Sequence, residues 1–344
     1  MKAMESIASE APRVISAFPD VVHRAAKQRR RRTRVAELFF ESFVRLSAFS
    51  AILVIFLIFV FVGREALPLL WQQPEPGLEY EAVTRQNLLG PTVYADRPAR
   101  FIWQPVSNVP KYNLPPLIIG TLKTTVVAIL FAGPLAILAA ILSSEFAPKW
   151  MREIIKPTIE LLAGIPSVVL GFFALMVLAS WLQGLLGLRL RLNALNAGIG
   201  LGLAVVPIIF TVAEDALTAV PRSYREASYA LGANTWETAI KIVVPAALPG
   251  IFAGVVLGFG RAVGETMIVL MASGNAAVTS WSFTDSVRTL SATIAAELGE
   301  VVFGGPHYRV LFLLGILLFI FTFTVNLSGE IAVGRLKRRL EGGK

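Results

Sequence analysis

Apolar residues gather in six long stretches, and polar or charged segments separate these stretches along the chain. Each stretch is long enough to cross about 30 Å of hydrocarbon, because a helix rises about 1.5 Å per residue. The pattern therefore predicts an all-α integral membrane protein with six transmembrane helices. The predicted helices cover residues 46–62, 118–142, 160–182, 194–212, 250–272 and 310–332.

The composition agrees with this class of protein, because 55% of the residues are hydrophobic and only 16% are charged. The net charge is +9, but the basic residues lie beside the predicted helices, in residues 24–34, 149–156, 222–241 and 335–339. Such runs are typical of topology signals and of contact with anionic membrane lipid, so we expect no nucleic-acid partner. By the positive-inside rule, both termini are expected in the cytoplasm.

These features divide the chain into four segments. We expect a cytosolic basic tail in residues 1–40, and a first transmembrane helix with a long extracytoplasmic loop in residues 41–115. The other five transmembrane helices form a core in residues 116–335, and residues 336–344 form a second basic tail. The long loop is interpreted either as a packed loop or as a docking surface for an extracytoplasmic binding protein.

The sequence lacks the residue patterns that are typical of enzymes. It has no cysteine, and His23 and His307 are isolated, so neither thiol chemistry nor a metal site is expected. The phosphate-binding pattern G-x-x-x-x-G-K-[ST] is absent, so we do not expect this chain to hydrolyse ATP. We therefore predict no catalytic residues and no cofactor on this chain.

The segment 221–249 is polar and charged, although apolar stretches flank it on both sides. Pro221 can begin a helix, and Gly232 can end that helix as its C-terminal cap. Asn234 and Glu237 have the spacing of a capping box, which begins a second helix. We therefore predict two short helices that are joined at Gly232 and lie at a membrane surface.

Later in the same segment, Pro245 and Pro249 are followed by Gly250. We expect these residues to interrupt the helix before the next transmembrane helix begins.

The spacing in this segment also resembles the E-A-A-x3-G-x9-I-x-L-P loop of ABC importer permeases. Ser228 and Val244 depart mildly from that pattern. In that family the loop is the coupling helix, which fits a cleft on a separate ATP-hydrolysing subunit; an ordinary cytoplasmic loop is the alternative. The resemblance implies contact with that subunit for Glu226, Ala227, Ser228, Gly232, Ile242 and Pro245.

Residues 100–335 as a whole resemble the permeases of inorganic phosphate importers. The runs ELLAGIPSVVLGF and GRAVGETM carry this resemblance, and GETM rather than GETAPL indicates the PstC-type subunit. The family implies a bacterial inner membrane location and three partner proteins. These are an ATP-binding subunit that holds ATP and Mg²⁺, a second permease of the PstA type, and an extracytoplasmic phosphate-binding protein.

The fifth predicted transmembrane helix contains Arg261, eleven residues after Gly250 and so about 16 Å along the helix. An arginine at the bilayer centre costs at least about 2.5–3.5 kcal/mol, so an idle lipid-facing position is not expected. Glu265 follows four residues later, on the same helix face. The two residues either form an ion pair that fixes helix packing or line an anion path, and the resemblance favours the path.

Other polar residues give weaker signals. We interpret Glu160, Gly164, Pro166 and Ser167 as a motif for gating or helix packing, with packing favoured, and Pro166 should disturb the helix there. Lys123, Thr124 and Thr125 either snorkel or line the path. Glu214 and Asp215, at the end of the fourth predicted helix, are expected to be solvated.

Together these observations predict the permease subunit of an ATP-driven inorganic phosphate importer. Two alternatives remain at this point. One is a permease for another oxyanion, such as sulfate or molybdate. The other is a non-transporting membrane scaffold or sensor of phosphate status.

Overall fold

The computed structural model describes residues 37, 40–71, 85–94, 97–108, 110–340 and 342. The predicted basic run at 24–34 and His23 therefore lie outside the described residues. The chain forms two compact units, Met1–Phe61 and Val62–Lys344. In the first unit, the described residues from Phe40 to Phe61 belong to an apolar helix that runs on to Ala66.

Within the described part of the chain, six helices are long and apolar enough to cross a membrane, which agrees with the predicted number. After the helix Phe40–Ala66, the second consists of α5 (Pro115–Ile141) and the π-helix η1 (Leu142–Phe146). The remaining elements of these spans are α7 (Ser167–Phe173), η2 (Ala174–Leu178), α8 (Ala179–Leu186), α9 (Ala194–Thr218), α11 (Thr235–Thr238), η3 (Ala239–Val243), α12 (Val244–Gly264) and α15 (Pro306–Leu340).

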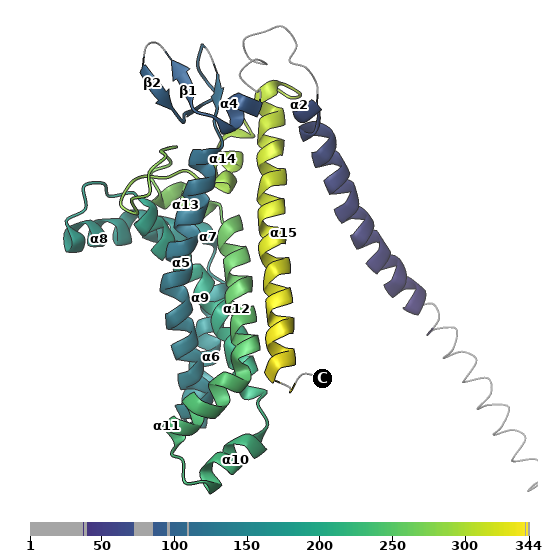
Figure 1. The fold of residues 1–344 in the computed structure, drawn as a ribbon, viewed down its shortest axis with the longest axis vertical. Coiled ribbons are helices and arrows are strands. Elements are labelled where there is room, and N and C mark those ends of the chain that lie inside the picture. Colours follow the sequence, from purple (N-terminus) through teal and green to yellow (C-terminus); the bar gives the residue numbers. More distant parts are fainter. Residues whose placement is uncertain are drawn as a thin grey trace, which may run out of the picture. The chain divides into compact units, whose positions relative to one another are not determined.

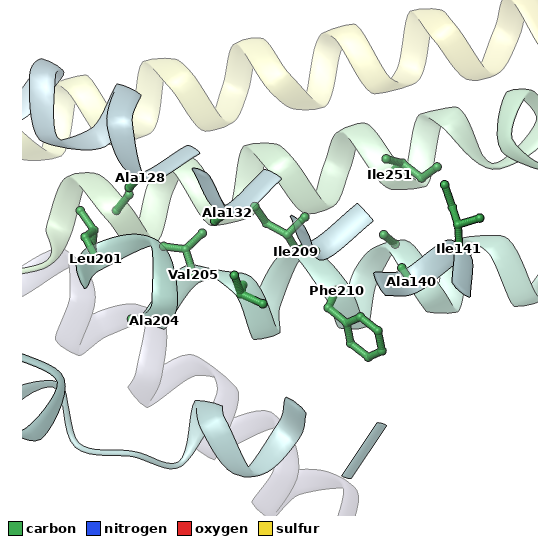
Figure 2. Close-up of a cluster of buried hydrophobic side chains, with 14 of the residues drawn as sticks. Ala128, Ala132, Ala140, Ile141, Leu201, Ala204, Val205, Ile209, Phe210 and Ile251 are labelled. Carbon is green, nitrogen blue, oxygen red and sulfur yellow. The ribbon is translucent and has the colours of Figure 1, made fainter. Parts of the chain in front are cut away.

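Helix α9 lies at the centre of the second unit, packed against α5 and α12, while α12 also packs against α15 (Figure 1). The contact between α5 and α9 depends on small residues, because Ala128, Ala132, Ala136 and Ala140 are fully buried at four-residue intervals. Small side chains at this spacing let two helix backbones approach closely. Larger side chains of α9, such as Ile209 and Phe210, belong to the same hydrophobic core as these alanines (Figure 2).

Two ends of this unit are distinct (Figure 1). One, here called the α10 end, carries α10 (Arg222–Ala230). The other, here called the hairpin end, carries α4 (Arg85–Leu89) and two antiparallel pairs of short strands. The strands are β1 (Thr92–Tyr94), β2 (Arg97–Arg100), β3 (Trp103–Gln104) and β4 (Lys111–Tyr112).

The hairpin end has its own hydrophobic core. Trp103 and Tyr112 of β3 and β4 are 5% and 2% exposed and belong to one cluster with Leu311 and Leu314 of α15. This part of the long loop is therefore packed, as one of the two interpretations predicted. The helix α14 (Leu290–Glu297) lies beside it and packs against α15 and α5.

The third predicted transmembrane helix does not begin at Glu160. Residues up to Ala163 belong to a separate helix, α6 (Lys149–Ala163), and the apolar helix begins at Ser167. Pro166 is the N-cap of α7 with an extended ψ of 136°, which agrees with the predicted disturbance. A proline at this place favours the start of a new helix over the continuation of the old one.

A substitution at Gly198 tests the close approach of α5 and α9. A Cβ atom there would lie 2.5 Å from the Cβ of Val127, so we expect Gly198→Ala to force the helices apart. The expected loss of stability is about 1–3 kcal/mol, measured as a lower midpoint of thermal unfolding in detergent. Gly334→Ala is the control, because a Cβ at Gly334 meets nothing within 4 Å. Equal midpoints for both variants would contradict the close contact.

Candidate functional site

The segment at the α10 end folds as two helices joined at Gly232, as predicted. Gly232 has a φ of +85°, a conformation that residues with a side chain rarely adopt. Its N–H donates to the Tyr229 carbonyl at 2.9 Å, and the Ala233 N–H donates to the Ser228 carbonyl at 3.2 Å. These two bonds form a Schellman motif, which satisfies the last carbonyls of α10.

The predicted capping box at the start of α11 is also present. The Asn234 Oδ1 accepts from the Glu237 N–H at 2.9 Å, and the Glu237 carboxylate accepts from the Asn234 N–H at 3.2 Å. Both donors would otherwise lack a partner at a helix start.

The predicted interruption at Pro245 and Pro249 is wrong, because the helix continues from α11 through η3 into α12. Pro245 stands in the first turn of α12, directly after the π-helix, and Pro249 lies within α12. The π-helix changes the bonding pattern there, since the Val244 N–H reaches back to the Ala239 carbonyl. A proline lacks an N–H and is tolerated best in a first helical turn.

Five of the six residues that match the coupling loop are exposed: Glu226, Ala227, Gly232, Ile242 and Pro245. Ser228 is buried, and its hydroxyl lies 2.9 Å from the Thr238 hydroxyl, which joins α10 to α11.

The surface of this segment also contains large apolar side chains that the motif did not indicate. Leu231 is 90% exposed, and Trp236 and Tyr224 are 63% and 53% exposed. Their signal in the sequence is the presence of large apolar residues in a polar loop. An exposed group of this kind often marks a contact surface for a partner protein.

Arg225 anchors α10 to the rest of the unit. Its guanidinium donates to both carboxylate oxygens of Glu145, at 2.6 Å and 3.1 Å, and to the carbonyls of Val220 and Leu217 at 2.7 Å and 3.0 Å. The hydrogen bond to Glu145 raises the pKa of Arg225 further above its usual range. Since Glu145 is in η1 and Leu217 is in α9, this residue ties α10 to the ends of two long helices.

A second ion pair lies at the same end. The Lys156 ammonium on α6 lies 2.8 Å from Glu214 and 3.0 Å from Asp215. The hydrogen bond to Glu214, followed by that to Asp215, raises the pKa of Lys156. The expectation that Glu214 is solvated is wrong, because its side chain is only 4% exposed. Lys156 compensates for this burial, since α6 packs on α9.

The remaining residues of the gating or packing motif lie around the break between α6 and α7. Gly164 is the C-cap of α6, Ser167 is the first residue of α7, and Glu160 is exposed on α6. Gly164, Pro166 and Ser167 together form the break between the two helices, and the Glu160 side chain takes no part in it.

The fifth transmembrane helix also breaks, and this changes the geometry that was predicted for Glu265. Helix α12 ends at Gly264, Glu265 is extended with a ψ of 133°, and a short helix α13 (Met267–Ala272) follows. Glu265 therefore does not share a helix face with Arg261. In a continuous helix, the Glu265 carbonyl would accept from the N–H four residues later. Here it accepts from the hydroxyl of Ser291 on α14 at 2.8 Å.

Arg261 lies on an exposed face of α12 together with Leu257 and Gly264, which are four residues before it and three after it. Among the described residues, no ion pair or hydrogen bond holds its guanidinium. The interpretation as an ion pair with Glu265 is thus not supported. Next to this face, Gly264 and Thr266 line a cavity of about 500 Å³ whose other walls come from α14, the two residues after it, and Leu318.

Lys123 neither snorkels nor lines an open path. Its side chain is buried, and its ammonium donates to the Ser280 carbonyl at 2.9 Å.

Comparison with known proteins identifies relatives for most of the chain. Residues 132–342 match the family described as "Binding-protein-dependent transport system inner membrane component". The chain is 38% identical over 221 residues to the probable ABC transporter permease protein YqgH of Bacillus subtilis, a match over 64% of this chain and 72% of that protein. It is 38% identical over 256 residues to the phosphate transport system permease protein PstC of Mesorhizobium japonicum, over 69% and 77% of the two chains.

A solved structure has a similar fold. It is a bacterial ABC transporter involved in the import of the acidic polysaccharide alginate, with a TM-score of 0.56 and 16% identity. The match covers 88% of this chain and 99% of that chain. At this level of identity, the likeness concerns the fold alone.

The anchor of α10 can be tested with Glu145→Gln, which leaves the Arg225 guanidinium without its carboxylate. Removing one partner of a largely buried ion pair costs about 3–5 kcal/mol, so α10 should detach more often. We expect faster trypsin cleavage after Arg222 in the variant. Glu153→Gln on the exposed side of α6 is the matched control and should leave cleavage unchanged. Equal cleavage of both variants would show that the pair does not hold α10.

Proposed function

Because this chain belongs to the family of binding-protein-dependent transport system inner membrane components, we propose that it is a permease subunit of an ATP-driven importer of inorganic phosphate. The observation that carries the proposal is the helix–Gly232–helix segment with its exposed coupling-loop residues. The proposal that the anion is phosphate is supported by relatives at 32–38% identity that are phosphate transport system permease proteins.

In this function, the segment at the α10 end contacts a separate ATP-binding subunit, which holds ATP and Mg²⁺. Its exposed apolar side chains, such as Leu231, are suited to burial in a cleft on that subunit. The Arg225–Glu145 pair then transmits a displacement of α10 to the ends of α5 and α9, because these helices and α10 share one network of hydrogen bonds. The α10 end is the cytoplasmic side in this arrangement, with both termini in the cytoplasm of a bacterial cell.

The exposed face of α12 around Arg261 would line the anion path. An unpaired arginine is costly in hydrocarbon, so this face should meet water, an anion or a partner protein. A second permease of the PstA type would provide the opposite wall of the path. Arg261 offers five N–H donors in a planar arrangement that fits phosphate oxygens. In this proposal, Glu265 at the break would accept a proton from protonated phosphate, and fully deprotonated sulfate lacks such a proton.

Leu231→Glu tests the contact with the ATP-binding subunit. A buried charge in an apolar contact is unfavourable, so we expect the ATP-binding subunit to be lost when the variant is purified by a tag on this chain. Val106→Glu at the hairpin end is the matched control, because Val106 is 92% exposed and Leu231 is 90% exposed. Loss of the subunit in both variants, or in neither, would contradict the proposed contact.

Arg261→Gln tests the anion path. We expect phosphate uptake by the assembled complex to fall about 10- to 150-fold, because a charge-assisted contact to the anion is worth about 1.5–3 kcal/mol. Arg189→Gln, which removes an exposed arginine outside the long helices, should leave uptake unchanged. Normal uptake by the Arg261 variant would refute this role.

The choice of anion is tested by competition against the uptake of labelled phosphate. Stronger competition by sulfate or molybdate than by unlabelled phosphate would assign the importer to another oxyanion.

A further inference from the structure

Helix α14 connects the break after Gly264 with the hairpin end, and the proposed function does not explain this connection. Its first residues contact the break between α12 and α13, and its last residue contacts the core of the hairpin end. The two contacts come from Ser291 and Glu297, which are six residues apart and so about 9 Å apart along the helix.

The first end of α14 fixes the position of the break. The Ser291 hydroxyl donates to the Glu265 carbonyl at 2.8 Å, and Ser291 is only 5% exposed. The Leu290 N–H donates to the Thr121 hydroxyl on α5 at 3.1 Å, which holds this end of α14 against a long helix. A carbonyl freed by a helix break in a membrane needs a new donor, and Ser291 supplies it.

The last residue of α14 is held from three sides. The Glu297 carboxylate lies 2.9 Å from the Arg288 guanidinium, 2.9 Å from the His307 ring, and 3.0 Å from the Trp103 indole nitrogen. These partners belong to the loop before α14, to α15 and to β3, respectively. The Glu297 side chain is 14% exposed, so this carboxylate is largely shielded from water while it joins three segments.

Two cavities border this connection, and the smaller one runs along α14 from Ser291 to Gly299. The cavity of about 500 Å³ beside the break includes Ser291 in its wall. A second cavity of about 760 Å³ is lined by Glu297, Glu300, His307 and the turn between β3 and β4. A short helix whose two ends are both bonded moves as a unit, so a change of shape at one cavity displaces the wall of the other.

We propose that α14 is a rigid connector, with Ser291 and Glu297 as positioning residues that couple the cavity beside Glu297 to the helix break next to Arg261. The proposal rests on the proposed transport function for its role in uptake, but the connection itself does not depend on the anion. Neither residue contacts Arg261. Ser291 acts through the backbone of Glu265, and Glu297 acts through the orientation of α14.

The chain has no cysteine, so a single introduced cysteine can report on the break. Gly264→Cys is suitable, because a Cβ there meets nothing within 4 Å and Gly264 lines the smaller cavity. The measurement is the rate at which a water-soluble maleimide labels this cysteine in membranes that contain the full chain. Gly184→Cys on α8, where a Cβ also meets nothing within 4 Å, is the control reporter.

In the Gly264→Cys chain, Ser291→Ala should raise the labelling rate by about two- to tenfold, the equilibrium shift that corresponds to one lost hydrogen bond. Ser291→Thr keeps the hydroxyl and should restore the original rate. Glu297→Gln should raise the rate as Ser291→Ala does, although the hydrogen bonds of its carboxylate go to Arg288, His307 and Trp103 and not to the break. Glu153→Gln, at an exposed carboxylate on α6 that lines neither cavity, should have no effect. Labelling of the Gly184 reporter should not change in any variant.

The same variants are then compared in phosphate uptake. We expect Ser291→Ala and Glu297→Gln each to lower the maximal rate with an unchanged KM, and the double variant to be no slower than the slower single variant. Independent sites would instead give additive losses. Unchanged labelling at Gly264 in both single variants would overturn the connector. If the variants change labelling but the complex with the unchanged chain transports no phosphate, the connector is supported and the proposed function is refuted.

Discussion

A backbone carbonyl or N–H inside a membrane must find a partner within the protein, because hydrocarbon offers none. The structure of this chain depends on how that requirement is met wherever a helix is not continuous. At the break after Gly264, the Ser291 hydroxyl donates a hydrogen bond to the Glu265 carbonyl. Near the start of α10, the Arg225 guanidinium donates to the carbonyl of Leu217 in the last turn of α9 and to the carbonyl of Val220 just after it. The irregular parts of the fold are therefore fixed by hydrogen bonds from particular side chains.

The regular part of the fold has the opposite character. Helices α5, α9 and α12 meet through alanine and glycine, so their contact depends on the absence of side chains rather than on particular ones. The fold therefore has a closely packed core and two sites at which single residues determine the geometry. One site is the coupling segment, and the other is the break beside Arg261.

The sequence predicted what is local and failed where partners are distant. The two helices at Gly232 and the capping box of Asn234 and Glu237 follow from residues within one short segment of the chain, and both are confirmed. The end of α12 was predicted eight residues too late, because an apolar run shows no sign of a break that depends on Ser291. The burial of Glu214 was missed for the same reason, since its partner Lys156 is 58 residues away. No local pattern could have paired Arg225 with Glu145.

The length of α15 has a consequence for the membrane around this protein. Its 35 residues give a rod of about 52 Å, whose basic last turn extends past a hydrocarbon layer of about 30 Å. Gly329 of α15 lies against Val256 of α12, and Asn326 lies against Gly260, so the two helices are in register along one contact. A thinner or thicker bilayer changes the tilt that suits such a rod, and through this contact it also inclines α12. Lipid composition thereby becomes a variable that acts on the same helix that carries Arg261.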